Sequence, residues 1–193
     1  MNHLEPEALR EYERCFVLPG TIHAICEDYR AGASADFAAD GRDRAQSMAL
    51  LEWLDEAYPT PAFLPRDIEA RYTVRELAYG IATEIHAVNN LPVLKYLKDP
   101  LGHSQDEIDV WYRTWLKRTL DPVEARLAQL GTGDFLHGDA PGLFEIVLVP
   151  QLANARRFGV DVSAYPRLLK AEAATKQVEA FADAAPDRQP DAE

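Results

Sequence analysis

The chain has 193 residues, of which 47% are hydrophobic and 27% are charged, a balance typical of a soluble globular protein. Its formal net charge of −12 argues against nucleic acid and anionic membranes as partners, because both are bound by clustered Lys and Arg. No apolar run reaches membrane-spanning length and the first residues, MNHLEPEALREYER, carry no targeting pattern, so we expect a cytoplasmic protein.

Residues 5–40 have the pattern of two helices and differ in character from the rest of the chain. Pro6 suits the first turn of one helix, and Thr21 can cap the next. The two cysteines, Cys15 and Cys26, fall in this segment. Nothing around them marks an activated thiol, so we expect reduced packing residues.

From Arg44 onward, hydrophobic residues recur at helical spacing in one segment after another. We predict helices over residues 44–58, from 67 past 88, and over 105–130, 143–155 and 167–184. The segment 143–155 is apolar on nearly every side, so other helices must surround it. We therefore predict an all-α fold, a helical bundle built around residues 143–155 with an extra helical segment at the N-terminus.

A polar face is expected near the end of the helix that begins at about residue 67. At 100° per residue, His86 and Asn90 share the face opposite the apolar stripe, and Asn89 lies at its edge. The stripe consists of Leu77, Ile81, Ile85 and Val88. This face is either solvated or the border of a binding cleft, and geometry alone favours the solvated face.

Four segments carry a resemblance to one enzyme family. They read LVPQLANARRFGVDVSAYP (148–166), QSMALLEWLDEAYPTPAFLP (46–65), EIHAVNNLPVLKYL (84–97) and DFLHGDAPGLFEIVLVPQ (134–151). They resemble zeta-class glutathione transferases, the family of maleylacetoacetate isomerase, in unbroken order over about residues 44–191. The bundle is then expected to be like the C-terminal domain of glutathione S-transferases.

The resemblance divides the chain into three parts. Residues 44–65 would be a remnant of the glutathione-binding domain with its linker, and residues 66–193 the helical C-terminal-like domain. Residues 1–43 instead resemble a cap segment of haloacetate dehalogenases, which places a junction near Gly41 to Gln46. A genuine gene fusion and a recombined reading frame would leave the same trace.

The resemblance also implies ligand-binding residues. Gln46 and Ser47 match the pair that holds the γ-glutamyl end of glutathione, and we expect them at a helix start, whose partial positive charge favours a carboxylate. For the substrate, the matching residues are His86, Asn89, Asn90 and Arg157. Arg157 would hold a carboxylate, although its simpler role is to share with Arg156 the negative end of the central helix.

Two departures from the family pattern concern catalysis and folding. The serine motif that activates the thiol of glutathione is absent from these residues, so no catalytic residue is identified. Pro92 replaces an arginine that often follows the motif NNL. Gly142 replaces a capping Ser or Thr while Glu145 keeps the acidic partner, which we expect to weaken the central helix by up to about 1 kcal/mol.

The implied function is glutathione-dependent cis–trans isomerisation of a maleyl acid in aromatic amino-acid catabolism, impaired by loss of the thiol-activating motif. Glutathione is the implied cofactor where its site is intact, with a small-molecule maleyl acid as substrate and no metal. The resemblance also allows a homodimer. The alternative is a non-catalytic helical binding or assembly domain, or the remnant of a truncated fusion, since uncovered helix faces would favour association.

Overall fold

The computed structural model describes residues 40–185 and 188, with the backbone alone for residues 40–47. The predicted all-α fold is confirmed, because the described residues form helices and no strand. The helices are α3 (Asp40–Ala57), α4 (Ile68–Tyr79), the π-helix η1 (Gly80–His86), α5 (Ala87–Asn89), α6 (Leu91–Lys98), α7 (Gln105–Leu130), α8 (Leu143–Arg157), α9 (Pro166–Thr175) and α10 (Glu179–Asp183).

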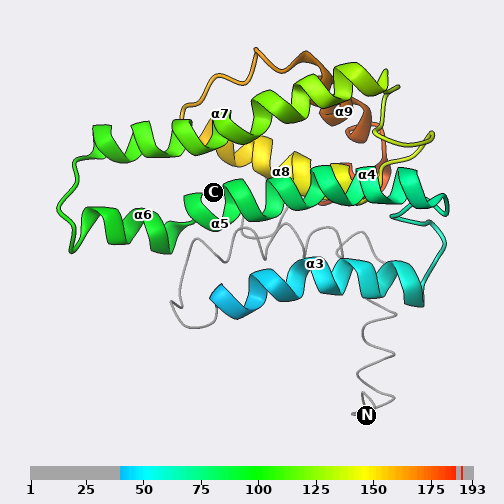
Figure 1. Ribbon diagram of the computed structural model, residues 1–193, viewed down its shortest axis with the longest axis horizontal. Coiled ribbons are helices and arrows are strands. Elements are labelled where there is room, and N and C mark those ends of the chain that lie inside the picture. The colour runs from blue at the N-terminus through cyan, green and yellow to red at the C-terminus, as the bar shows by residue number, and fades with distance from the viewer. Residues whose placement is uncertain (1–39, 186–187, 189–193) are drawn as a thin grey trace, which may run out of the picture.

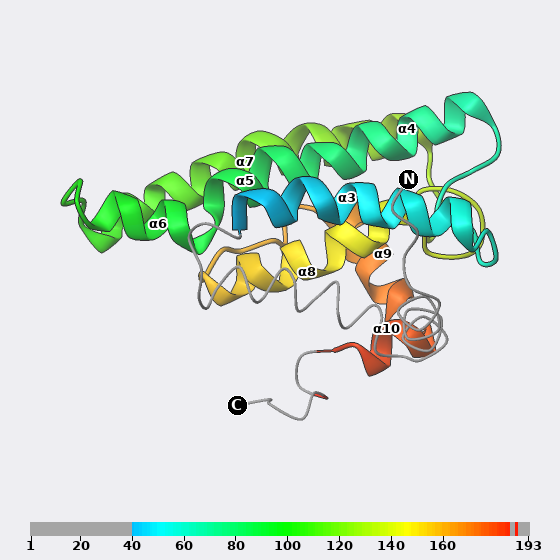
Figure 2. The same cartoon turned by 90° about the horizontal axis from the view of Figure 1, so that it is seen from below.

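The helices form a bundle with α8 at its centre. Figure 1 shows α7 antiparallel to the continuous run from α4 to α6, with α3 on the other side of that run. The view from below shows α8 beneath them, its last residues directed toward the α5 and α6 end of the bundle (Figure 2). Helix α8 contacts α4, η1 and α9. Residues 143–155 are thus the central helix that the sequence predicted.

The core is made by apolar residues on the facing sides of these helices. Helix α8 buries residues from nearly all around its axis, as a helix without a polar face must. Its buried apolar side chains are Leu143, Phe144, Ile146, Val147, Leu148, Leu152 and Ala155. Helix α7 adds its own stripe, which includes Tyr112, Leu116 and Leu120, whereas Trp111 and Trp115 are only half-buried.

The N-terminus of α8 is capped by backbone from a distant loop. The Leu143 N–H donates to the Phe63 carbonyl oxygen at 2.9 Å. A Cβ on Gly142 would lie 2.7 Å from that oxygen, so only glycine allows the loop to approach. Whether Gly142 weakens the helix stays a prediction, and the Phe63 carbonyl does part of the capping that a serine would have supplied.

The helix predicted from residue 67 past 88 is uninterrupted, but it is not an α-helix throughout. It passes from α4 into the π-helix η1, ends with α5, and leaves helical geometry at Asn90 with ψ of 163°. The wider turns of a π-helix rotate successive side chains by less than 100°. The face that we predicted at 100° per residue is therefore displaced, and Asn89 and Asn90 are buried rather than solvated.

Two domain predictions fall at or beyond the edge of the described residues. Helix α3 begins at Asp40 and runs across the predicted boundary between residues 43 and 44. The two helices predicted within residues 5–40 lie outside the described residues. So do most of residues 1–43, for which we predicted a likeness to a dehalogenase cap. The three-part division stays a prediction.

Candidate functional site

The two arginines at the end of α8 have different environments. Arg156 makes a two-pronged ion pair with Glu172 of α9, with Nη1–Oε1 and Nη2–Oε2 distances of 2.5 and 2.6 Å. The bonded Glu172 carboxylate raises the pKa of Arg156, against the effect of burial. Arg157 is exposed and has no carboxylate partner among the described residues. Both arginines were predicted to interact with the negative end of the helix. Among the described residues, only Arg156 also has a carboxylate partner.

Tyr112 is buried and packs against Phe158, the residue that follows Arg157. Its ring stacks on that of Phe158, with ring centroids 4.3 Å apart and planes inclined by 20°. Burial raises the pKa of Tyr112, while the Gln151 side chain and the positive charge of Arg157 act in the opposite direction. The stacked rings place the end of α8 against Tyr112.

Several buried polar atoms near this point lack a hydrogen bond. Among the described residues, the Tyr112 hydroxyl, the Gln151 amide nitrogen and oxygen, and the Asn89 Oδ1 have no partner of acceptable geometry. Each of the three residues is at least 97% buried, because their exposed fractions are 1%, 1% and 3%. Unpartnered buried polar groups are uncommon in folded proteins and call for a specific explanation.

The predicted residues of segment 86–90 have different contacts. The Asn89 Nδ2 donates to the Tyr112 backbone carbonyl at 3.0 Å. Asn90 caps α6, because its Oδ1 accepts from the Val93 N–H at 2.9 Å and its Nδ2 donates to the Ala87 carbonyl at 2.8 Å. His86 is half-buried at the end of η1. The structure thus joins Asn89 to the Arg157 end of α8 through Tyr112 and Phe158, while Asn90 shapes the turn.

Gln46 and Ser47 do not lie at a helix start. Helix α3 begins at Asp40, six residues before Gln46. Free N–H groups occur only in the first four positions of a helix. The partially positive helix terminus expected at this pair is therefore not found, and the role of the two residues toward glutathione stays a prediction.

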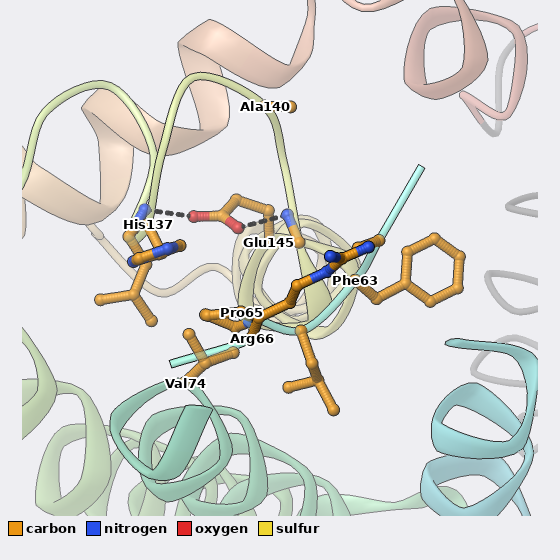
Figure 3. Close-up of a pocket in the computed structure, with 11 residues that line it drawn as sticks. Phe63, Pro65, Arg66, Val74, His137, Ala140 and Glu145 are labelled. Carbon is orange, nitrogen blue, oxygen red and sulfur yellow. Dashed lines mark hydrogen bonds between the residues drawn. The ribbon is translucent and has the colours of Figure 1, made fainter. Parts of the chain in front are cut away.

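A small pocket lies at the opposite end of α8. It has a volume of about 170 Å³ and is lined by residues that include Phe63, Arg66, Val74 and His137, with Glu145 inside (Figure 3). Both Glu145 oxygens are occupied, because they accept from the Leu136 and Gly142 N–H groups at 2.8 and 2.9 Å. Burial raises the pKa of Glu145, against those hydrogen bonds. This carboxyl therefore fastens Leu136 and Gly142 to the start of α8, and its bond to Gly142 is the capping contact predicted for Glu145.

The pocket and Arg157 lie at opposite ends of α8. Helix α8 has 15 residues, so its ends are about 21 Å apart at 1.5 Å per residue. Within the described part of the chain, no group of three or more His, Cys, Asp or Glu could hold a metal ion. No helix in that part is long and apolar enough to cross a membrane.

Sequence reasoning missed Tyr112 as a site residue and gave Gln151 no role. Gln151 was visible as one of few polar residues in an otherwise apolar helix, and a buried amide in such a place is a usable signal. Tyr112 stands between the two larger aromatic residues Trp111 and Trp115, and nothing in the periodicity distinguishes it. Only the three-dimensional packing shows that Tyr112, and not Trp111, faces α8.

Comparison with known proteins identifies the family. No family model matches the chain. A maleylpyruvate isomerase from a Ralstonia species is 44% identical over 147 residues, which are 76% of this chain and 69% of the relative. The chain belongs to the zeta-class glutathione transferases.

Solved structures of the family agree with this fold. The holo structure of a bacterial maleylpyruvate isomerase, a zeta-class glutathione S-transferase, has a TM-score of 0.73 at 42% identity, covering 76% of this chain and 70% of that one. A maleylacetoacetate isomerase from Anaeromyxobacter dehalogenans has a TM-score of 0.70 at 42% identity, over 76% and 65% of the two chains. That structure holds dicarboxyethyl glutathione and citrate in its active site.

Proposed function

We propose that this protein works in glutathione-dependent cis–trans isomerisation of a maleyl acid, and that its helical domain holds a substrate carboxylate at Arg157. The observation that carries this proposal is the difference in environment between the two arginines at the end of α8. Arg156 is engaged by Glu172, while Arg157 presents an exposed guanidinium without a carboxylate partner among the described residues. A guanidinium offers paired donors that match a carboxylate.

The chain's own residues supply the substrate side of this chemistry. Glutathione, when bound, supplies a thiolate that adds reversibly to the double bond, so that rotation about the resulting single bond can precede elimination. Gln46 and Ser47 have the amide and hydroxyl groups that a γ-glutamyl end requires. Arg157 would keep the carboxylate in place while the carbon skeleton rotates, and no described residue is assigned to thiol activation.

Calorimetric titration of the full chain with maleate, a simple maleyl acid, and separately with glutathione tests the proposal. We expect Arg157→Gln to weaken maleate binding about tenfold or more, because a hydrogen-bonded charge pair is lost. The matched control is Arg126→Gln, which removes the same charge on α7. Arg126 lies 14 residues, or about 21 Å along the helix, from Tyr112.

The glutathione titration has its own control, the double variant Gln46→Ala, Ser47→Ala. Binding that this variant abolishes would support the predicted glutathione ligands. A protein that is helical by circular dichroism but gives no heat with either ligand would contradict the isomerase proposal. It would instead favour the alternative, a non-catalytic helical domain.

We also propose that the chain forms a homodimer through α3 and α4. The Arg75 guanidinium of α4 binds the Glu52 carboxylate of α3 at 2.9 and 2.8 Å, so the two helices share one surface. The two helices also carry exposed large apolar side chains, namely Leu50 and Trp53 on α3 and Ile68, Tyr72 and Tyr79 on α4. Exposed apolar residues that gather on one surface favour a protein partner.

A further inference from the structure

The position of Arg157 depends on whatever fixes the end of α8. Arg157 has no ion pair within the described residues, in contrast to Arg156, which is fastened to α9 through Glu172. Phe158 follows Arg157 directly, and its N–H donates to the Asn154 carbonyl at 3.1 Å. Gly159 then turns the chain away with φ of +69°. Phe158 is therefore the first side chain after Arg157 that can anchor it.

Phe158 is anchored by Tyr112. The two rings stack closely, and Tyr112 is almost completely enclosed, with 1% of its surface exposed. An enclosed ring cannot change rotamer without displacing its neighbours. The half-buried Phe158 is thus held against a fixed surface.

Helix α7 is fixed in turn against the segment that carries the other predicted site residues. The Trp111 Nε1 donates to the Val88 carbonyl at 3.1 Å, and the Tyr112 carbonyl accepts from Asn89 at 3.0 Å. Trp111 and Tyr112 of α7 are therefore hydrogen-bonded to the two consecutive α5 residues Val88 and Asn89. This register determines how far His86 lies from the end of α8.

We infer that Tyr112 is a positioning residue, whose ring holds Arg157 in place through Phe158 while its backbone carbonyl holds Asn89. One residue thereby fixes the spacing between the two groups of substrate-binding residues. The inference rests on the proposed function for the identity of the ligand. The mechanical claim, that Tyr112 restrains the backbone at Arg157 through Phe158, stands without it.

The Tyr112 hydroxyl is not needed for this role. The ring, and not the hydroxyl, stacks on Phe158, and the neighbour that acts on the hydroxyl is Gln151. Removing the hydroxyl while keeping the ring should therefore preserve the restraint. Removing the ring should release it.

The experiment compares Tyr112→Phe, Tyr112→Leu and Phe158→Leu in the full chain. Calorimetry with maleate should give a dissociation constant close to the wild-type value for Tyr112→Phe and about three- to tenfold weaker binding for the two leucine variants. The matched control is Tyr165→Leu. Tyr165 is also buried, and its hydroxyl donates to Asp121 of α7 at 2.9 Å, so its loss should lower stability and leave binding unchanged.

A second readout does not require maleate to bind. The ¹⁵N relaxation of the Arg157 backbone amide reports the mobility of this end of α8 on the picosecond-to-nanosecond scale. We expect ordered behaviour in the wild type and in Tyr112→Phe, and increased mobility in the leucine variants. Phe158→Leu carries the test if Tyr112→Leu does not fold.

The outcomes separate the inference from the proposed function. If Arg157→Gln weakens maleate binding while both leucine variants bind like the wild type, the inference is overturned and the proposed function stands. If maleate does not bind to any variant, the proposed function fails, and the relaxation of the Arg157 backbone amide alone decides the inference. Weakened binding in Tyr112→Phe would also overturn it, because the hydroxyl rather than the ring would then act.

Discussion

At the scale of single residues, the structure changes the expected effect of restoring a cap at Gly142. Compared with the family pattern, Gly142 looks like a lost cap, and restoring serine looks like an obvious improvement. The Phe63 carbonyl occupies the space that a side chain would need, with a distance of 2.7 Å to the position of a Cβ. Asp55 holds this loop, because its Oδ1 accepts from the Leu64 N–H at 3.1 Å.

We therefore predict that Gly142→Ser lowers the free energy of unfolding by about 1–3 kcal/mol, the usual cost of an overpacked site. Urea denaturation followed by circular dichroism measures the change. Gly133→Ser is a suitable control, because a Cβ at Gly133 meets nothing within 4 Å. A serine variant at residue 142 as stable as the wild type would show that the loop at Phe63 can withdraw at no cost.

At the scale of secondary-structure elements, the end of α8 separates stability from binding. Arg156→Gln leaves the Glu172 carboxylate, whose side chain is 7% exposed, without its counter-charge. The Arg156 side chain is itself 42% exposed, which reduces the effect. We expect a loss of about 1–3 kcal/mol in the free energy of unfolding with maleate affinity retained.

Arg157→Gln should have the opposite pair of effects, with stability retained and affinity lost. Thermal denaturation and calorimetry of the two variants therefore form one test of adjacent residues. If both variants lost affinity equally, the end of α8 would be acting as a diffuse patch of positive charge. The assignment of the carboxylate to Arg157 would then be wrong.

Elements also show what sequence could predict and what it could not. Residues 143–155 were predicted to be the central helix because an apolar segment of that length has no other place in a folded domain. The π-helix η1 was missed because the sequence GIATEIH has no pattern that distinguishes i to i+5 hydrogen bonding from that of an α-helix. At 100° per residue, geometry favoured a solvated face for His86 and Asn90 with Asn89 at its edge, whereas the structure buries both asparagines.

The site itself was predictable only through the resemblance of motifs. The sequence NARRF indicates two arginines at a helix end, but nothing local shows which of them will find a carboxylate. That choice depends on Glu172 of α9, 16 residues away. The contact of Tyr112 with Phe158 joins residues on two helices and is likewise a property of the packed bundle.

At the scale of the whole molecule, strong negative charge opposes the association that the apolar surface of α3 and α4 favours. Two chains that each carry a net charge of −12 repel one another, and salt screens this repulsion within a distance of about 10 Å at 0.1 M ionic strength. Apolar burial is hardly weakened by moderate salt. The dimer should therefore become more stable as the salt concentration rises.

Sedimentation equilibrium should consequently give a mass close to twice the 21.6 kDa of the chain, with a dissociation constant that falls between low and moderate salt. Tyr72→Glu should shift the equilibrium toward monomer, because Tyr72 is 62% exposed on the proposed interface and the variant places a further negative charge there. Val110→Glu adds the same charge at a position on α7 that is 56% exposed and should change the equilibrium little. A wild-type chain that stays monomeric at every salt concentration would contradict the dimer, and equal effects of the two variants would place the interface elsewhere.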